Sequence, residues 1–247
     1  NRFFHCAFHN SGRGDGFIFT SSNREGIKSP YVTNGNSTNT EQRFYGTSFA
    51  SSGDGGVGLR ITGKGDVSVH GGYFSAKPTK KWGQPFAGVY LDGTRGISNV
   101  TIRDVRMECT NYSLYAVGAV NGVLIEGGEW IAMNAENIRH VERVPSGERP
   151  HRYVEDPNAT GRARNWVIRG LRLSRSFEAY PALALDKTER REAVSSIRFD
   201  ALQDSRISNI SYYVRRHAPG KAAWGGDIAT DRPHVVVEHY CRRNYFE

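Results

Sequence analysis

Residues 123–130 read Val123-Leu-Ile125-Glu126-Gly-Gly-Glu129-Trp130, and this short pattern recurs along the chain. The segments that align with it without gaps are Val67-Ser-Val69-His70-Gly-Gly-Tyr73-Phe74, Val100-Thr-Ile102-Arg103-Asp-Val-Arg106-Met107 and Trp166-Val-Ile168-Arg169-Gly-Leu-Arg172-Leu173. Looser copies are Ile197-Arg-Phe199-Asp200-Ala-Leu-Gln203 and Val235-Val-Val237-Glu238. Each copy begins with an apolar–x–apolar alternation, which is typical of a half-buried strand. A small residue or Asp commonly follows, which suits a bend.

A second apolar strand precedes most copies of the pattern. These strands are expected at residues 58–61, 88–91, 114–117 and 183–185. Val100 and Val123 are 23 residues apart, which predicts one coil of chain, whereas the longer step from Val123 to Trp166 predicts a coil with an inserted loop. Repeats of this size cannot bury their apolar face alone, so the pattern predicts that they stack.

We therefore predict an all-β fold, a right-handed single-stranded parallel β-helix (a solenoid) with loop insertions. It forms one domain over residues 1–247, with the clearest coils in 57–240 and a charged insertion at 133–164. A two-sheet sandwich or jelly roll is the structural alternative, but its hairpins would reverse the chain, whereas this repeat keeps one polarity. The first residues already have the pattern of a strand, so we expect the chain to belong to a longer or processed polypeptide.

Composition limits the classes of partner. The formal net charge of +8 favours an anionic partner, and the absence of a nucleic-acid-binding signature argues against nucleic acid. No apolar stretch approaches the roughly 20 residues that cross a bilayer, which predicts no membrane span. The three cysteines, Cys6, Cys109 and Cys241, form no C-x-x-C pair, so we expect free thiols, no metal site and no cofactor.

The rhythm of the coils over residues 57–240 resembles that of the pectate-lyase-like β-helix superfamily, which includes pectin-acting enzymes and bacteriophage tailspikes. The paired-Asp and Gly-His-Gly motifs of polygalacturonases and the Arg-x-Pro-x-x-Arg motif of pectate lyases have no counterpart in this chain. The resemblance implies a polysaccharide partner, a location outside the cell or on a virion surface, and assembly as a homotrimer.

The alignment places charged residues at two equivalent positions of successive coils. The first position holds His70, Arg103, Glu126, Arg169 and Asp200, and the second holds Tyr73, Arg106, Glu129, Arg172 and Gln203. Coils stack about 4.8 Å apart, so each set is expected to form an outward column. In the catalytic interpretation Arg103, Arg106, Glu129, Arg169 and Arg172 bind a glycan.

Glu126 and Asp200 are then the acid and the base. Their expected separation of about 10 Å is at the long edge of the range of about 6.5–9.5 Å found in inverting glycosidases. The alternative is a surface salt-bridge ladder in which each pair contributes little.

Loops supply the remaining candidate residues. Arg139, His140 and Arg143 lie in the insertion at 133–164, where a long excursion from a regular scaffold is a common place for binding residues. Lys81 and Trp82 form a smaller basic-aromatic group that suits an acidic sugar, although both segments also have the composition of solvated loops.

These patterns favour a polysaccharide-binding protein that cleaves an acidic glycan, by hydrolysis or by β-elimination. The alternative function is a non-catalytic spike or adhesin, and the sequence is compatible with either.

Overall fold

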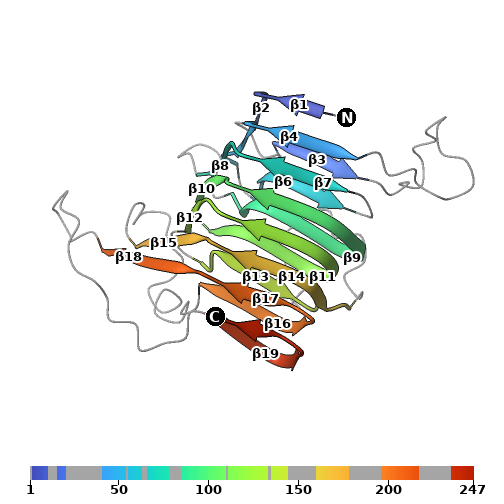
Figure 1. The fold of residues 1–247 in the computed structure, drawn as a ribbon. Helices are drawn as coiled ribbons and strands as arrows, with labels where there is room; N and C mark the ends of the chain where they lie inside the picture. Colours follow the sequence, from blue (N-terminus) through green and yellow to red (C-terminus); the bar gives the residue numbers. More distant parts are fainter. Residues whose placement is uncertain are drawn as a thin grey trace, which may run out of the picture.

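The computed structural model describes residues 2–10, 16–20, 41–53, 55–62, 66–77, 85–109, 111–132, 135–143, 160–177, 196–216 and 235–247. Every regular element among these residues is a β-strand, and the pairings between these strands are parallel. The protein is therefore all-β with parallel sheets (Figure 1). Within the described residues, this polarity excludes a sandwich of antiparallel hairpins.

One sheet has seven strands, ordered in space as they are in sequence. Its strands are β2 (Ala7–Asn10), β5 (Ser48–Ser51), β8 (Tyr73–Ala76), β10 (Arg106–Cys109), β12 (Glu129–Ala132), β15 (Arg172–Phe177) and β18 (Ser211–Arg216). We call this sheet row C.

The other sheet has thirteen strands. They are β1 (Arg2–Phe4), β3 (Phe17–Thr20), β4 (Gln42–Tyr45), β6 (Val57–Thr62), β7 (Val67–His70), β9 (Ala87–Arg103), β11 (Tyr112–Glu126), β13 (Ile138–Val141), β14 (Ala163–Arg169), β16 (Ile197–Gln203), β17 (Arg206–Ser208), β19 (Val235–Arg242) and β20 (Tyr245–Phe246).

The larger sheet consists of two rows because its long strands bend. The first part of β9 pairs with β6 and its last part pairs with β7. In the same way β11 pairs with both β13 and β14, and these two strands both pair with β16, so the four strands close a ring. Row A contains β3, β6, the first parts of β9 and β11, β13, and the first parts of β16 and β19. Row B contains β1, β4, β7, the last parts of β9 and β11, β14, β17 and β20.

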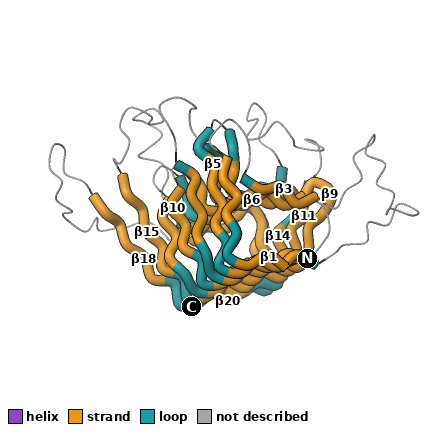
Figure 2. The backbone as a smooth tube through the Cα atoms, turned by 90° about the horizontal axis from the view of Figure 1, so that it is seen from above, coloured by secondary structure: helices purple, strands orange, loops and turns teal. Residues whose placement is uncertain are grey.

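Each passage of the chain through rows A, B and C is called a layer, and the bend between rows A and B is called the corner. Viewed along the stack, the strands of successive layers lie over one another around a shared interior (Figure 2).

The interior is a continuous apolar core drawn from all three rows. Phe49 and Phe74, from adjacent layers of row C, stack with ring centroids 4.8 Å apart, and Trp130 and Trp166 are fully buried. Burying one large apolar side chain contributes roughly 1.5–3 kcal/mol. Burial of the apolar residues of the apolar–x–apolar repeat therefore stabilises the stacking of the layers.

The turn after row B needs a left-handed backbone in every layer that contains it. The residues at this position have φ between 50° and 66°, and they are His5, Gly46, Gly71, Asp104, Gly127, Gly170 and Asn209. Glycine and short polar residues accept this conformation most readily. At Gly128, the next position, a Cβ atom would lie 2.2 Å from the carbonyl oxygen of Val105. The small residues that follow the repeated strands are thus required by the turn.

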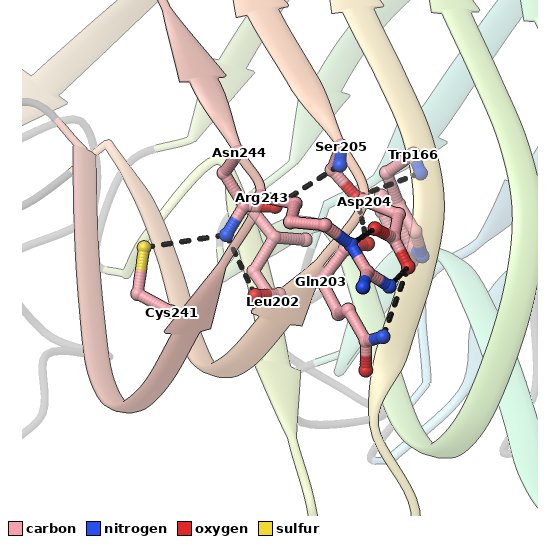
Figure 3. Close-up of polar contacts among 8 residues, drawn as sticks. All are labelled: Trp166, Leu202, Gln203, Asp204, Ser205, Cys241, Arg243 and Asn244. Atoms are coloured by element: carbon pink, nitrogen blue, oxygen red, sulfur yellow. Dashed lines mark hydrogen bonds and ion pairs between the residues drawn. The ribbon is translucent and has the colours of Figure 1, made fainter.

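Side chains at the corner tie the last layers to each other (Figure 3). The backbone N–H of Trp166 donates to Ser205 Oγ over 2.9 Å, and the N–H of Ser205 donates to Asn244 Oδ1 over 3.0 Å. Asp204 forms an ion pair with Arg243, whose Nη2 lies 2.8 Å from Asp204 Oδ2. These contacts link three consecutive layers.

The structure confirms the register of the four gap-free copies and corrects the looser two. Val67, Val100, Val123 and Trp166 pair in that order in row B. Ile197, however, pairs with Ile138 and Val235 in row A.

The row B partners of β14 are instead residues 206–208. The true fifth copy begins at Ser205, whose hydroxyl accepts the hydrogen bond from Trp166. A polar residue therefore replaces the apolar one that begins the earlier copies.

Three further expectations concern a membrane span, the cysteines and one predicted strand. Within the residues that the structure describes, no helix is long and apolar enough to cross a membrane. Cys6, Cys109 and Cys241 are all free thiols. Burial raises the pKa of Cys109 to about 12, so this thiol stays protonated and inert. The expected strand at 183–185 lies outside the described residues.

Candidate functional site

Two carboxylates from neighbouring strands meet where row A reaches the corner. Asp200 lies in β16 and Glu238 in β19, and the register of these strands shifts between Phe199 and Ala201. Phe199 pairs with Val237 and Ala201 with Tyr240, so Asp200 faces a segment that carries one extra residue. Such bulges re-aim side chains and are common beside active sites.

Asp200 is held by one charged group and one backbone group. Its Oδ1 lies 2.7 Å from Arg139 Nη2, and its Oδ2 accepts a hydrogen bond of 3.0 Å from the backbone N–H of Glu142. Both partners come from the preceding layer, because Arg139 lies in β13 and Glu142 directly follows it. The carboxylate is therefore fixed from the side opposite to Glu238.

Glu238 is held mainly by Arg198, its neighbour on the adjacent strand. Arg198 Nε donates to Glu238 Oε1 over 2.6 Å, and Arg198 Nη2 contacts the same oxygen. Arg139 Nη2 lies 3.9 Å from Glu238 Oε2, and Arg198 Nη1 lies 3.7 Å from Glu136 Oε1. Arg139 thus contacts both carboxylates, while Arg198 joins Glu238 to the buried Glu136.

The pKa values of the two carboxyl groups are shifted in opposite directions. Partial burial raises the pKa of Asp200 above its usual value, and the charge and hydrogen bond of Glu238 add to this rise. Partial burial would also raise the pKa of Glu238, but the hydrogen bond and charge of Arg198, together with Arg139, lower it instead. As the pH falls, Asp200 therefore takes up a proton more readily than a free aspartate does, and Glu238 less readily than a free glutamate does. Pairs of this kind divide the roles of acid and base between them.

The insertion predicted at 133–164 begins too early, because Ile138–Val141 form the scaffold strand β13. The chain leaves and rejoins the scaffold at Glu142 and Gly161, beside this pair. The backbone N–H of Gly161 donates to the carbonyl oxygen of Glu142 over 3.0 Å, and Arg162 Nε lies 3.3 Å from Glu142 Oε1. The Arg162 guanidinium also lies 3.9 Å from the centre of the Tyr240 ring. Glu142 therefore joins the ends of the insertion to Asp200.

The predicted column through Glu126 exists, but Asp200 is not part of it. His70, Arg103, Glu126 and Arg169 pair in order in row B, and the next residue in the column is Ser208. Asp200 lies in row A because the copy that contains it belongs there. Glu126 and Asp200 are therefore not two members of one column, and the separation expected for an inverting pair does not apply to them.

Glu126 is enclosed by its neighbours in the column. Its Oε2 lies 3.0 Å from Arg103 Nε, and its Oε1 lies 2.5 Å from Arg169 Nη2. At the other end of the column, Tyr45 stacks on His70 with ring centroids 5.2 Å apart. This is the arrangement of the ladder alternative, in which the charges satisfy one another.

We expect Glu126→Gln to lower the free energy of unfolding by less than about 1 kcal/mol, because the ion pairs that it removes are partly exposed. Urea unfolding of both proteins measures this difference. Turnover on any cleaved glycan should stay unchanged. If turnover of Glu126→Gln fell by about 100-fold, Glu126 would be a catalytic acid or base after all.

The second column is also correct in its first four members. Tyr73, Arg106, Glu129 and Arg172 pair in order in row C, followed by Ser211. Gln203 is not in this column, because it pairs with Arg164 and Arg242 at the corner.

Arg106 is also held within its own strand. Its Nη2 donates to Glu108 Oε1 over 2.8 Å, and Lys77 pairs with the other oxygen of Glu108. Arg106 is therefore already neutralised by a carboxylate next to it.

The remaining predicted binding residues lie in different places in the structure. His140 is wrong as a binding residue, because it is fully buried and its ring stacks on Phe199 at 5.9 Å. Arg139 lies at the site, and Arg143 is exposed at the start of the insertion. Lys81 and Trp82 lie outside the described residues.

Sequence reasoning missed Glu238 and Arg198 as site residues. The signal was present, because the two looser copies align Asp200 with Glu238 at the same position. Reading both copies as row B strands hid their shared place in row A.

Within the described residues, no cluster of His, Cys, Asp and Glu is arranged to hold a metal ion. The chain matches no protein-family model, no curated protein and no solved structure. The interpretation of the site therefore rests on its own geometry.

Proposed function

We propose that the chain is a right-handed single-stranded parallel β-helix that binds a polysaccharide outside the cell or on a virion surface and hydrolyses it. The stacking of three parallel rows, layer by layer and in register, supports this architecture. It is also the architecture of the pectate-lyase-like superfamily that the sequence resembles. The observation that carries the catalytic part is the pairing of Asp200 with Glu238.

Asp200 is the proposed general acid. Its raised pKa favours the protonated form, and once protonated it would donate that proton to a glycosidic oxygen placed at the pair. Protonation lets the bond between the sugar carbon and this oxygen break. Arg139 keeps the Asp200 carboxyl group in position throughout.

Glu238 is the proposed nucleophile. The two carboxyl groups are hydrogen-bonded to each other, and a bound sugar would part them to the separation of about 5–5.5 Å that retaining glycosidases use. The ionised Glu238 would bond to the sugar carbon as the leaving group departs. Water, deprotonated by Asp200, would then release the sugar with its original configuration.

The non-catalytic alternative is a shaft or adhesin. It is favoured by the column of Arg103, Glu126 and Arg169, whose charges are satisfied within the protein. Such a ladder gives rigidity and needs no substrate.

A panel of neutral and acidic bacterial and algal polysaccharides distinguishes these functions. We expect new reducing ends from at least one glycan, without the unsaturated sugars that β-elimination produces. Unsaturated products would overturn hydrolysis. Binding without any cleavage across the panel would favour the adhesin.

The insertion is expected to contribute to glycan binding, because both of its ends lie at the carboxylate pair. Replacing residues 144–159 with a short Gly-Ser linker should leave the unfolding temperature nearly unchanged, since Glu142 and Gly161 are already hydrogen-bonded and loop closure depends weakly on length. Affinity electrophoresis should show weaker binding of the glycan. Equal binding by the two proteins would remove the insertion from the site.

A further inference from the structure

The carboxylate pair lacks a free cation for an acidic sugar. Among the described residues, each arginine around it already has a carboxylate partner. Arg139 contacts Asp200, Arg198 contacts Glu238, and Arg162 contacts Glu142. An acid group of the substrate would therefore have to be held elsewhere.

The corner next to the pair provides two such cations. Arg164 of β14, Gln203 of β16 and Arg242 of β19 lie side by side in adjacent layers. Both arginines are exposed, and within the described ranges neither lies at ion-pair distance from a carboxylate, although the nearby charge of Arg242 helps to lower the pKa of Asp204. Gln203 lies three positions after Asp200 on the same strand, so the corner continues directly from the pair.

Neighbouring cations at this end of the stack are neutralised. Arg206 pairs with Glu247 over 3.3 Å, and Arg243 pairs with Asp204. Arg206 also lies 4.9 Å from the centre of the ring of Tyr245, which is 53% exposed. The exposed ring of Tyr245 thus lies three residues after Arg242 in the same layer, where it could stack on a sugar of a chain with acid groups.

We propose that Arg164 and Arg242, with Gln203 between them, bind the acid groups of an anionic polysaccharide whose neutral sugar lies at Asp200 and Glu238. This inference rests on the proposed function and names its substrate class. Gln203 Nε2 already donates to Asp204 Oδ2 over 2.9 Å, so the charge for the substrate comes from the two guanidinium groups, which would each take one acid group.

The spacing of the charges favours a polysaccharide over a nucleic acid. The backbones of Arg164 and Arg242 are two strand positions apart, or about 10 Å. An alternating acidic glycan carries one acid group on every second sugar, so its charges are widely spaced. Duplex DNA carries one charge per about 1.7 Å and is bound by much denser arrays of cations.

The test uses the double variant Arg164→Gln, Arg242→Gln. Binding of alternating uronic-acid polymers and of neutral dextran is measured by calorimetry at low salt. We expect the wild-type protein to prefer the acidic polymer, and the double variant to bind it about tenfold more weakly. Added salt should weaken wild-type binding and have less effect on the variant. Arg43→Gln, at the other end of the stack, serves as the control and should bind as the wild type does.

Several outcomes would overturn the proposal. These are equal binding of the acidic polymer by the double variant, equal loss in the control, or equal wild-type affinity for a single-stranded DNA of similar charge. The proposed function fails separately. If Asp200→Asn and the wild type bind the polymer alike and neither cleaves any glycan, the result supports the anion-binding surface and contradicts the proposed hydrolysis.

Discussion

Asp200→Asn is expected to lower the turnover of a cleaved glycan by about 100-fold or more, the usual scale for the loss of a general acid. The amide keeps the size of the carboxyl group and its contact with the N–H of Glu142, but it cannot donate a proton with the same acidity. Glu238→Gln should cost at least as much, since it removes the proposed nucleophile. Release of reducing ends over time measures both effects.

The matched control is Asp204→Asn. Asp204 lies four positions after Asp200 and pairs with Arg243 at the corner, away from Glu238. We expect this variant to retain full turnover at saturating glycan, because Asp204 contacts Gln203 of the anion-binding surface and not the carboxylate pair. A similar loss in the control, or full activity in either site variant, would contradict the assignment.

The pH profile of the wild type supplies a second readout. The reaction needs Glu238 ionised and Asp200 protonated. Turnover should rise as the pH passes the lowered pKa of Glu238 and fall as it passes the raised pKa of Asp200. The optimum is therefore expected on the acidic side of neutrality.

The scaffold could be predicted because its physical requirement is local. Val123 and Ile125 alternate with polar residues, and Gly127 and Gly128 provide the turn that follows. The same requirement recurs in each layer, so the alignment placed Val100 and Trp166 beside them correctly. Periodicity and turn chemistry were sufficient there.

The site could not be predicted to the same degree, because it depends on contacts between distant segments. Ser205 replaces the apolar residue that begins earlier copies, so the row B copy was not recognised. The alignment used residues 197–203 in its place and therefore assigned Asp200 to row B, although it lies in row A. The shift of register beside Asp200 has no local signature in the sequence. Only the folded arrangement shows that Arg139 contacts two carboxylates from later layers.

His140 illustrates the same limit, since its place on a strand makes it a core residue and not a ligand. Its Nε2 lies 2.9 Å from the carbonyl oxygen of Gly118, which assigns the proton to this nitrogen. Burial lowers the pKa of His140 to about 4, from an unperturbed value of 6.5. The core therefore packs around the neutral form of the His140 ring.

This packing around a neutral ring makes the stability of the fold depend on pH. Above about pH 6.5 the ring is neutral in both the folded and the unfolded chain, so its protonation takes nothing from the free energy of unfolding. As the pH falls from 6.5 to about 4, the unfolded chain binds the proton while the folded protein does not, so stability is lost. Below that range both forms bind it and the loss stops. The total is about 3 kcal/mol, from about 1.4 kcal/mol for each pH unit.

His140→Gln is expected to remove this contribution. The glutamine amide can still donate to Gly118, although the lost ring lowers stability at every pH. The decisive quantity is the difference between wild type and variant in free energy of unfolding, measured by urea titration at a series of pH values. We expect the difference to shrink by about 3 kcal/mol between pH 6.5 and pH 4. The exposed His239, changed to Gln, is the control and should leave the slope unaltered. A constant difference across this range would show that His140 takes up its proton without unfolding the core, and the buried, neutral assignment would be wrong.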